Sequence, residues 1–294
     1  MTVRTLDADA LREWPLPALA KDADKEVRGR ILVVAGSREI AGAAVLAATA
    51  ALRMGAGKLL IATAASAATQ MMFAMPEARV IALPETKGGG FAIQGVDLIE
   101  PYLRDAHAAV IGPGMMDTDA TVEFTRALMP QFAHTPVLLD AAAMDVLLAC
   151  KRFDSPVLLT PHAGEMAHLT GDSKENVSDD QERVALDAAK RWNAFVALKG
   201  ATTLVATPEG QLWRHVGGSA GLATSGSGDT LAGAIAGLCA RGATLEQACA
   251  WGVVLHARAG EQLSKRISQI GYLAREIPDE MLAVLNDLSP ATPG

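Results

Sequence analysis

The stretch Gly221-Leu222-Ala223-Thr224-Ser225-Gly226-Ser227-Gly228-Asp229 runs directly into the apolar segment Thr230–Leu238. Small residues in a loop let backbone N–H groups come close to an anion, and the positive end of a following helix dipole points at the same place. The stretch therefore predicts a phosphate-binding loop that opens a helix. Asp229 allows two interpretations: a group that handles a cation or a substrate proton, or a simple N-cap, because aspartate is favoured there.

Short apolar runs alternate with helical patterns over most of the chain, and most of the runs lack polar alternation. Such runs are typical of strands buried on both faces of a parallel sheet. The predicted strands are Ile31–Ala35, Leu59–Thr63, Val80–Leu83, Ala109–Ile111, Val137–Asp140, Val157–Thr160, Phe195–Leu198, Thr203–Ala206 and Leu212–Val216. The predicted helices are Ala43–Met54, Ala120–Phe132, Gln181–Trp192, Leu231–Ala240 and Leu245–Leu263. This alternation predicts a three-layer α/β fold with a mostly parallel central sheet and helices on both faces.

One segment departs from this pattern just before the phosphate-binding loop. Leu204–Trp213 contains the turn residues Pro208 and Gly210, which predict a late antiparallel hairpin. Neither a linker nor a repeat divides the chain, so we expect a single domain over residues 1–294. Residues 1–29 are expected to wrap the surface before the first strand, and residues 289–294 to form a flexible tail.

Composition excludes several functional classes. The 294 residues are 50% hydrophobic and 20% charged, with a formal net charge of −7 and no block of Lys or Arg, which argues against a nucleic-acid partner. The first residues carry no signal-peptide segment and no apolar run predicts a membrane span, so we expect a cytoplasmic protein. Cys150, Cys239 and Cys249 lack metal-ligand spacing and are typical of buried thiols in a reducing compartment.

Glycine-containing or polar segments follow four of the predicted strands. They are Gly36-Ser37 with Ala41-Gly42-Ala43, Gly112-Pro113-Gly114, Thr160–Glu165 and Lys199–Thr203. Each alone is explained by turn formation. Because ligands of open α/β sheets bind at the carboxyl ends of strands, the four together predict a cleft for a nucleotide and a second ligand.

Each polar residue at that edge of the sheet can be explained by a functional role or by a structural one. His162 either bonds a ligand or forms a turn, and Glu165 either orders water or a cation or favours the helix dipole. Lys199 either screens phosphate charge or is merely solvated. His256 is better explained as a packed helix residue than as a ligand. The sequence contains no Walker A pattern, no GxGxxG after a strand, no GxSxG elbow and no HExxH.

Gly226-Ser227-Gly228-Asp229 resembles the glycine-x-glycine-aspartate anion hole of the ribokinase-like superfamily. Further segments make the resemblance more specific: Arg30–Gly36, Gly42-Ala43-Ala44, Ala51–Gly57, Gly112-Pro113-Gly114, Thr160–Glu165, Lys199–Thr203 and Gly221–Asp229. In that order, from about Trp14 to the last helix, they resemble the ADP-dependent NAD(P)H-hydrate dehydratase family, which repairs hydrated nicotinamide cofactors.

The resemblance implies a role for each matching residue. The implied nucleotide-binding residues are Lys199, Gly200, Ala201, Thr202, Thr203 and Gly228, and the implied anion hole consists of Gly226, Ser227 and Gly228. The implied contacts to the hydrated dinucleotide are Ala43, Gly114, His162 and Asp229. Asp229 would be the catalytic base at the reacting group, with Mg²⁺ and ADP or ATP as cofactor and phosphoryl donor. Glu165, if it has a metal role, would act through water.

The chain departs from the family pattern at two positions. The family usually has proline where Ala163 stands, which predicts a looser turn at His162. It usually has glycine where Ser225 stands, which predicts an altered loop next to the anion site. The resemblance also implies a homo-oligomer, a tetramer, and a stand-alone form. Since residues 1–29 are too few for an epimerase domain, that activity is expected on another chain.

The implied chemistry is coherent. Phosphorylating the ring hydroxyl of NADHX or NADPHX turns a poor leaving group into a good one, and the ring nitrogen then expels phosphate. Such phosphoryl transfer depends on positioning, Mg²⁺ and an anion hole. Two alternatives stay open: a kinase of the same superfamily acting on a sugar or vitamin precursor, and a nucleotide-binding regulator without catalysis.

Overall fold

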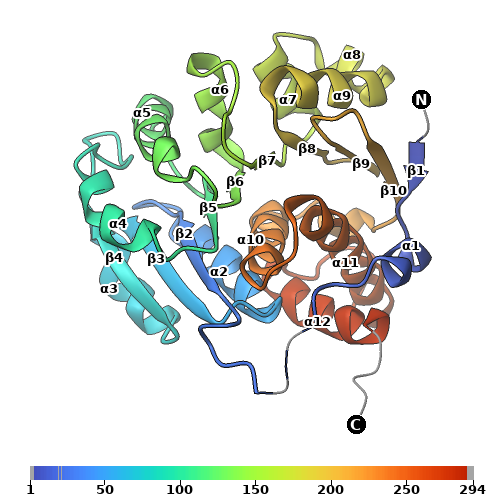
Figure 1. Ribbon diagram of the computed structural model, residues 1–294, viewed down its shortest axis with the longest axis horizontal. Coiled ribbons are helices and arrows are strands. Elements are labelled where there is room, and N and C mark those ends of the chain that lie inside the picture. The colour runs from blue at the N-terminus through green and yellow to red at the C-terminus, as the bar shows by residue number, and fades with distance from the viewer. Residues whose placement is uncertain (1–2, 19, 21, 290–294) are drawn as a thin grey trace.

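The computed structural model describes residues 3–18, 20 and 22–289, which form one ten-stranded sheet with helices around it (Figure 1). The strands are β1 (Val3–Thr5), β2 (Arg30–Val34), β3 (Lys58–Ala64), β4 (Ala78–Leu83), β5 (Ala108–Ile111), β6 (Val137–Leu139), β7 (Val157–Leu159), β8 (Phe195–Leu198), β9 (Thr202–Ala206) and β10 (Leu212–Val216). Their order across the sheet is β1-β10-β9-β8-β7-β6-β5-β2-β3-β4. Each predicted strand is present with bounds within two residues of those expected.

The structure contains more helices than the sequence predicted. They are α1 (Ala8–Glu13), α2 (Gly42–Arg53), α3 (Ala65–Ala74), α4 (Gly95–Leu103), α5 (Thr118–Leu128), α6 (Val146–Ala149), α7 (Ala163–Thr170), α8 (Lys174–Asp179), α9 (Gln181–Trp192), α10 (Ser227–Ala240), α11 (Leu245–Arg266) and α12 (Ile277–Leu288). Short 3-10 helices cover Met129–Gln131, Ala141–Asp145, Ala220–Leu222 and Ala274–Glu276. The α/β prediction is confirmed.

The helices lie in two layers, one on each face of the sheet (Figure 1). Alternate residues of β2 show the two faces: Ile31 and Val33 pack with α2, α10, α11 and α12, whereas Leu32 and Val34 pack with the layer that contains α5 and α9. All these strand residues are buried. The unalternating apolar runs of the sequence therefore reflect burial on both faces.

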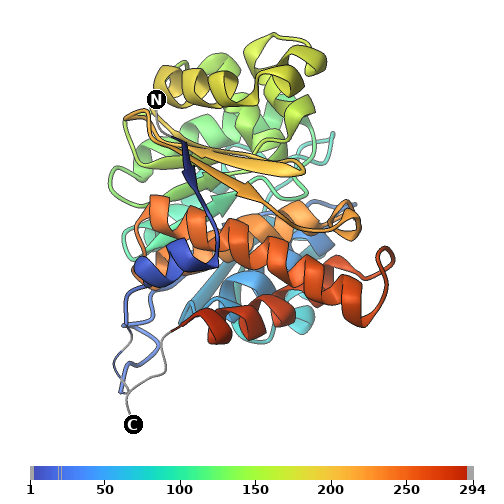
Figure 2. The ribbon, with the colours of Figure 1, turned by 90° about the vertical axis from the view of Figure 1, so that its right-hand side faces the viewer.

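The strands in the centre of the sheet are parallel, as predicted. One edge of the sheet contains two further features, an additional antiparallel pair and an additional strand. Strands β2 to β8 pair in parallel, and β9–β10 is the expected antiparallel hairpin. The β8–β9 pair is also antiparallel. Beyond β10, the N-terminal segment adds β1 in parallel, and Figure 2 shows it continuing to α1 beside α11.

The N-terminal segment is more regular than a surface wrap. Leu6 and Leu11 are fully buried, and Asp7 caps α1 by accepting from the N–H groups of Asp9 and Ala10. A three-residue strand and a six-residue helix are too short for a periodic signal, so the sequence does not show them. Of the expected tail, residues 290–294 lie outside the described residues.

Helix α10 packs closely against α2. A Cβ added to Gly233 would lie 2.1 Å from the backbone oxygen of Ala47, so only glycine lets the two backbones approach this far. Both helices begin at the carboxyl edge of the sheet, and their packing fixes where the anion loop sits. No helix of the described part of the chain is long and apolar enough to cross a membrane.

Candidate active site

The predicted anion loop ends earlier than the sequence suggests. Helix α10 begins at Ser227, so Ser227, Gly228 and Asp229 form its first turn rather than the loop before it. Gly226 precedes it with φ +89°, a left-handed conformation that glycine adopts without strain. Glycine and serine are weak helix formers, which is why the pattern predicted a start at Leu231.

Two backbone donors of this turn are free. The N–H of Ser227 donates to the carbonyl of Thr224 at 3.2 Å, so it is occupied within the loop. The N–H groups of Gly228 and Asp229 find no acceptor among the described residues. The first turn of a helix leaves such donors for an anion. The N–H of Gly226 also finds no acceptor among the described residues, so Gly226 and Gly228 of the predicted trio keep a free donor, Ser227 does not, and Asp229 adds one.

Ser225 does not disturb the loop. The only non-glycine residues with positive φ among the described ones are Asp117, Ala141 and Asn193, so Ser225 has an ordinary backbone conformation. Its side chain is exposed. The left-handed turn that needs glycine is at Gly226, and serine at position 225 therefore adds no strain.

His256 of α11 contacts the first residue of α10 through hydrogen bonds. Its Nε2 lies 3.1 Å from the carbonyl oxygen and 3.0 Å from the Oγ of Ser227. Because a carbonyl only accepts, Nε2 carries the proton and donates. Burial, chiefly, lowers the pKa of His256 to about 4, against a raising contribution from its hydrogen bond to Ser227. The expectation of a packed helix residue is confirmed, and its contact fixes the anion turn.

Lys199 and Asp140 form a buried ion pair at the ends of β8 and β6. The Lys199 Nζ lies 3.4 Å from Asp140 Oδ1, and the Asp140 side chain is 5% exposed. The same oxygen accepts from Thr160 Oγ1 at 2.7 Å. Asp140 therefore anchors two strand ends at once, and a charge this deeply buried needs such partners.

Lys199 also lies over the anion turn. A Cβ on Gly228 would be 3.3 Å from Lys199 Nζ, so the ammonium group sits close to the first turn of α10. Burial is the largest influence and opposes the charge, but Asp140, Glu165 and Asp229 together raise the pKa of Lys199. The ammonium is thus charged and placed next to the free N–H groups.

Asp229 is not the N-cap of α10. The N-cap is Gly226, and the helix has no side-chain cap. Burial first, and repulsion by Asp140 second, raise the pKa of Asp229 to about 6 against the attraction of Lys199. A half-buried carboxylate that titrates near neutrality and caps nothing fits the acid–base interpretation better than the capping one.

His162 and Glu165 together cap α7. Nδ1 of His162 accepts from the N–H groups of Gly164 and Glu165 at 3.0 and 3.1 Å, and Glu165 Oε2 accepts from the His162 N–H. The turn expected from the sequence is therefore present as a capping box. Since Nδ1 accepts, Nε2 carries the proton, and the 59% exposed side chain can donate to a ligand.

Ala163 occupies the first position of α7, where proline is favoured. The family's proline fits this position, and the capping box holds His162 with alanine there as well. Glu165 Oε2 lies 4.0 Å from Lys199 Nζ, which links the α7 turn to the ion pair. Whether alanine loosens the His162 turn relative to proline stays a prediction.

Ala43 and Gly114 are neighbours at the other half of the same edge. A Cβ on Gly114, whose φ is +65°, would lie 2.6 Å from the Ala43 Cβ. Two residues earlier, a Cβ on Gly112 would be 1.8 Å from the carbonyl oxygen of Asp140. The β5 loop thus packs on the end of β6, and both groups of predicted ligand residues share the carboxyl edge of the sheet.

The remaining residues predicted to bind the nucleotide form the turn from β8 into β9. Gly200 and Ala201 make the turn, and Thr202 and Thr203 begin β9. Thr203 Oγ1 donates to the Gly200 carbonyl at 3.4 Å. The segment lies directly beside Lys199, as the resemblance implies.

Asp140 is the site residue that the sequence did not single out. It was included as the last residue of a strand, and the structure ends that strand at Leu139. The next residue, Ala141, has φ +48°, a strained conformation for alanine. The available signal was a carboxylate at the end of a buried strand, beside the other three strand ends.

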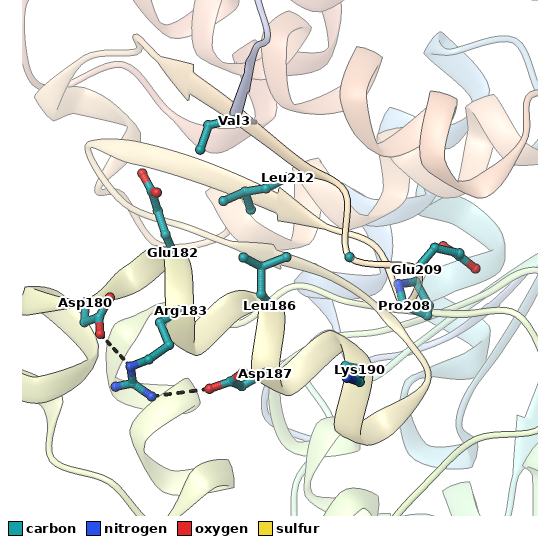
Figure 3. Close-up of a pocket in the computed structure, with 11 residues that line it drawn as sticks. Val3, Asp180, Glu182, Arg183, Leu186, Asp187, Lys190, Pro208, Glu209 and Leu212 are labelled. Carbon is teal, nitrogen blue, oxygen red and sulfur yellow. Dashed lines mark hydrogen bonds and ion pairs between the residues drawn. The ribbon is translucent and has the colours of Figure 1, made fainter. Parts of the chain in front are cut away.

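A separate cavity of about 540 Å³ lies at α9 and the β9–β10 turn, away from these residues (Figure 3). Several of its charged groups are paired: Arg183 contacts Asp180 and Asp187, as the dashed lines show. Glu182 pairs with Arg214. The groove contains none of the predicted site residues.

Comparison with known proteins decides the family. Residues 31–282 match the model of the NAD(P)H-hydrate dehydratase family. The chain belongs to this family. An ADP-dependent (S)-NAD(P)H-hydrate dehydratase of Xanthomonas campestris pv. campestris is 50% identical over 286 residues, which cover 97% of each chain.

A solved structure and a longer relative are also similar to this chain. A crystal structure of the ADP/ATP-dependent NAD(P)H-hydrate dehydratase of Bacillus subtilis, co-crystallised with ATP/Mg²⁺, matches with a TM-score of 0.85 and 29% identity, covering 98% of this chain and 100% of that one. A bifunctional NAD(P)H-hydrate repair enzyme of Moorella thermoacetica is 37% identical over 93% of this chain. The match covers 52% of that enzyme, so the chain spans about half of its length.

Proposed function

We propose that this chain is an ADP-dependent (S)-NAD(P)H-hydrate dehydratase, which returns hydrated NADH and NADPH to NADH and NADPH. The observation that carries the proposal is the position of Asp229. Its half-buried carboxylate, with a pKa of about 6, stands on a helix turn that offers two free N–H groups beside the Lys199 ammonium. The names of the Xanthomonas and Bacillus relatives support the substrate class.

The reaction needs two steps. The hydroxyl on the carbon beside the ring nitrogen attacks the β-phosphorus of ADP, so a new O–P bond forms and the bond from that phosphorus to the bridging oxygen breaks, releasing AMP. The hydroxyl proton passes to Asp229. The ring nitrogen lone pair then expels phosphate by breaking the C–O bond. The neighbouring ring carbon gives up a proton to the released phosphate or to water, and the electron pair of that C–H bond restores the ring double bond.

The residues of the site divide these tasks. Asp229 accepts the proton as general base, which its pKa near the working pH favours. The N–H groups of Gly228 and Asp229 and the Lys199 ammonium stabilise the negative charge of the phosphoryl group in transit. Asp140 keeps Lys199 in place, and the exposed Nε2–H of His162, with Ala43 and Gly114, is proposed to contact the hydrated dinucleotide.

The donor set fits a magnesium ion that arrives with the nucleotide. No group of three His, Cys, Asp or Glu among the described residues is close enough to hold a metal ion by itself. Mg²⁺ in nucleotide sites typically keeps several waters and binds phosphates with one or two carboxylates. Glu165 is our candidate for a contact through water; when bound, the ion would neutralise phosphate charge.

The test is incubation of the purified protein with (S)-NADHX, Mg²⁺ and ADP, followed by absorbance of NADH and by quantification of AMP and free phosphate. We expect the three products in equal amounts, and a parallel reaction with ATP measures the donor preference. A stable phosphorylated product would identify a kinase, and absence of turnover with retained nucleotide binding would identify a regulator; either result would overturn the proposal. The homo-oligomer and a separate epimerase stay predictions of the resemblance.

A further inference from the structure

A second cavity, of about 370 Å³, lies between the C-terminal ends of α2, α10 and α12. Its lining includes Arg28, Arg53 and Arg241 together with the polar side chains of Asn286 and Ser289. Helix α10 spans 14 residues from the anion turn to this cavity. At 1.5 Å per residue, the cavity lies roughly 20 Å from the proposed active site.

Two of the three arginines have no acidic partner among the residues that the structure describes. Arg53 pairs with Asp279, at 2.6 Å between Nε and Oδ1. Arg28 and Arg241 have no carboxylate within 4.0 Å in the part of the chain that the structure describes. Both side chains line this cavity, and burial first, and the charge of Arg28 second, lower the pKa of Arg241.

The contacts that these arginines make compensate their charge only in part. Arg28 Nε donates to the Gly55 carbonyl at 3.1 Å, and Arg241 reaches the carbonyls of Met54 and Pro17 only at 3.5 and 3.4 Å. Nε of Arg241 is buried and finds no acceptor among the described residues. Carbonyl oxygens at a helix C-terminus carry only partial negative charge, which offsets part of the two positive charges and leaves several N–H donors available.

The α9 groove provides the contrast within the same chain. There Arg183 lies between Asp180 and Asp187, and all three side chains are mostly exposed (Figure 3). Water and the two carboxylates balance that guanidinium. In the cavity lined by Arg28 and Arg241, no carboxylate of the described residues lies within 4.0 Å of either guanidinium, although the protein as a whole has a net charge of −7. An unbalanced, partly buried pair of cations is stabilised by an anion.

We propose that this pocket, defined by Arg28 and Arg241, binds a small phosphate-type anion. Guanidinium groups present planar N–H pairs that match phosphate oxygens, and two of them match a dianion in charge. The cavity volume lies within the range typical of small-molecule sites, so it can also hold a group attached to the phosphate. The proposal does not depend on the activity assigned to the edge of the sheet.

The test is calorimetric titration of inorganic phosphate into the protein with its active site saturated by Mg²⁺ and ADP, so that the anion turn is occupied. We expect one saturable phosphate site in the wild type. Arg28→Gln and Arg241→Gln should each weaken it by about tenfold or more, the range for a hydrogen bond to a charged group. Arg183→Gln, which removes an arginine from the α9 groove, is the matched control and should bind phosphate as the wild type does.

Arg28 is half-exposed, so Arg28→Gln is the variant expected to fold without difficulty, and thermal melts of all variants check this. Arg241→Lys keeps the charge and should keep part of the affinity. Absence of saturable phosphate binding in the wild type would overturn the proposal. Unchanged affinity in a folded Arg28→Gln variant together with unchanged affinity in Arg241→Gln would overturn it as well.

Discussion

The charges at the carboxyl edge of β5–β8 and the charges of the α9 groove differ in how far water reaches them. At the edge, the side chains of Asp140 and Lys199 are 5% and 21% exposed. In the groove, those of Arg183 and Asp187 are 56% and 70% exposed. The groove is nevertheless a cavity of about 540 Å³, and it is easily seen in Figure 3.

The difference indicates that a large cavity is not by itself evidence for a functional site in this fold. Exposed ion pairs contribute little, because water solvates each partner almost as well as the other does. Buried charges must be held by specific partners, and at the sheet edge those partners come from the ends of β6, β7 and β8 and from the first turns of α7 and α10. The variants below therefore remove charges from the edge first and from the groove last.

Asp229→Asn should have the largest effect. Asparagine keeps the size of the side chain but cannot accept the hydroxyl proton, so turnover of NADHX with ADP should fall by roughly 10²–10⁴-fold. Single-turnover formation of NADH measures the chemical step, and ADP binding should stay near the wild-type value. Near-normal turnover would remove Asp229 from the chemistry.

The same variant should not lose stability. The pKa of Asp229 is raised in the folded protein, so the stability it contributes is present at low pH and is lost as the pH rises through about 6. Asparagine carries no charge to bury, so thermal melts at pH 7 should show a melting temperature equal to or above that of the wild type. A lower one would indicate a structural role instead.

Lys199→Met should destabilise the fold through Asp140. The variant leaves a buried carboxylate with Thr160 but without its cation, which should lower the free energy of unfolding by about 2 kcal/mol. The double variant with Asp140→Asn removes both charges and should recover part of that loss. Chemical denaturation of the two single variants and the double variant forms a double-mutant cycle; purely additive losses would contradict the pairing.

His162→Asn separates capping from binding. Asparagine is a good N-cap, so α7 should keep its stability, whereas the Nε2–H, which lies 3.6 Å from Glu165 Oε2 on a mostly exposed side chain, is lost. We expect the KM for NADHX to rise by the loss of one hydrogen bond, about 1–2 kcal/mol, with kcat less affected. His162→Ala should add a loss of stability to the same kinetic change. If only the KM for ADP rose, the ligands would be assigned to the wrong residues.

Arg183→Gln should have the smallest effect. The guanidinium lies in the solvated groove and its removal leaves two exposed aspartates. Steady-state kinetics and melting temperature should both match the wild type. A change in turnover would mean that the α9 groove takes part in function, against the comparison made above.

Much of this site could be predicted from the sequence, because glycines and polar residues mark the strand ends. The buried runs from Ile31 to Val216 predicted the sheet, and the β5, β7 and β8 loops gave Gly114, His162 and Lys199. A parallel sheet brings such loops to one edge whatever the details of packing. The resemblance then added the role of each residue.

What the sequence could not show depends on tertiary contacts. Asp140 becomes a site residue only because β6 lies between β5 and β7, which places its carboxylate next to Lys199 and Thr160. The strand β1 and the helix α1 are too short for a periodic signal. The start of α10 was misplaced because propensity alone disfavours its glycine and serine, whereas packing against α2 extends the helix over them.

The pH dependence of kcat/KM for NADHX, compared between the wild type and Asp229→Asn, tests the central claim most directly. A base must be deprotonated to act, so kcat/KM of the wild type should rise with pH, level off above about 6, and fall by about tenfold per pH unit well below that value. The residual activity of Asp229→Asn should lack this acidic limb, although nucleotide and Mg²⁺ titrate identically in both samples. The same limb in both proteins would show that another group titrates, and would contradict the assignment of Asp229 as the base.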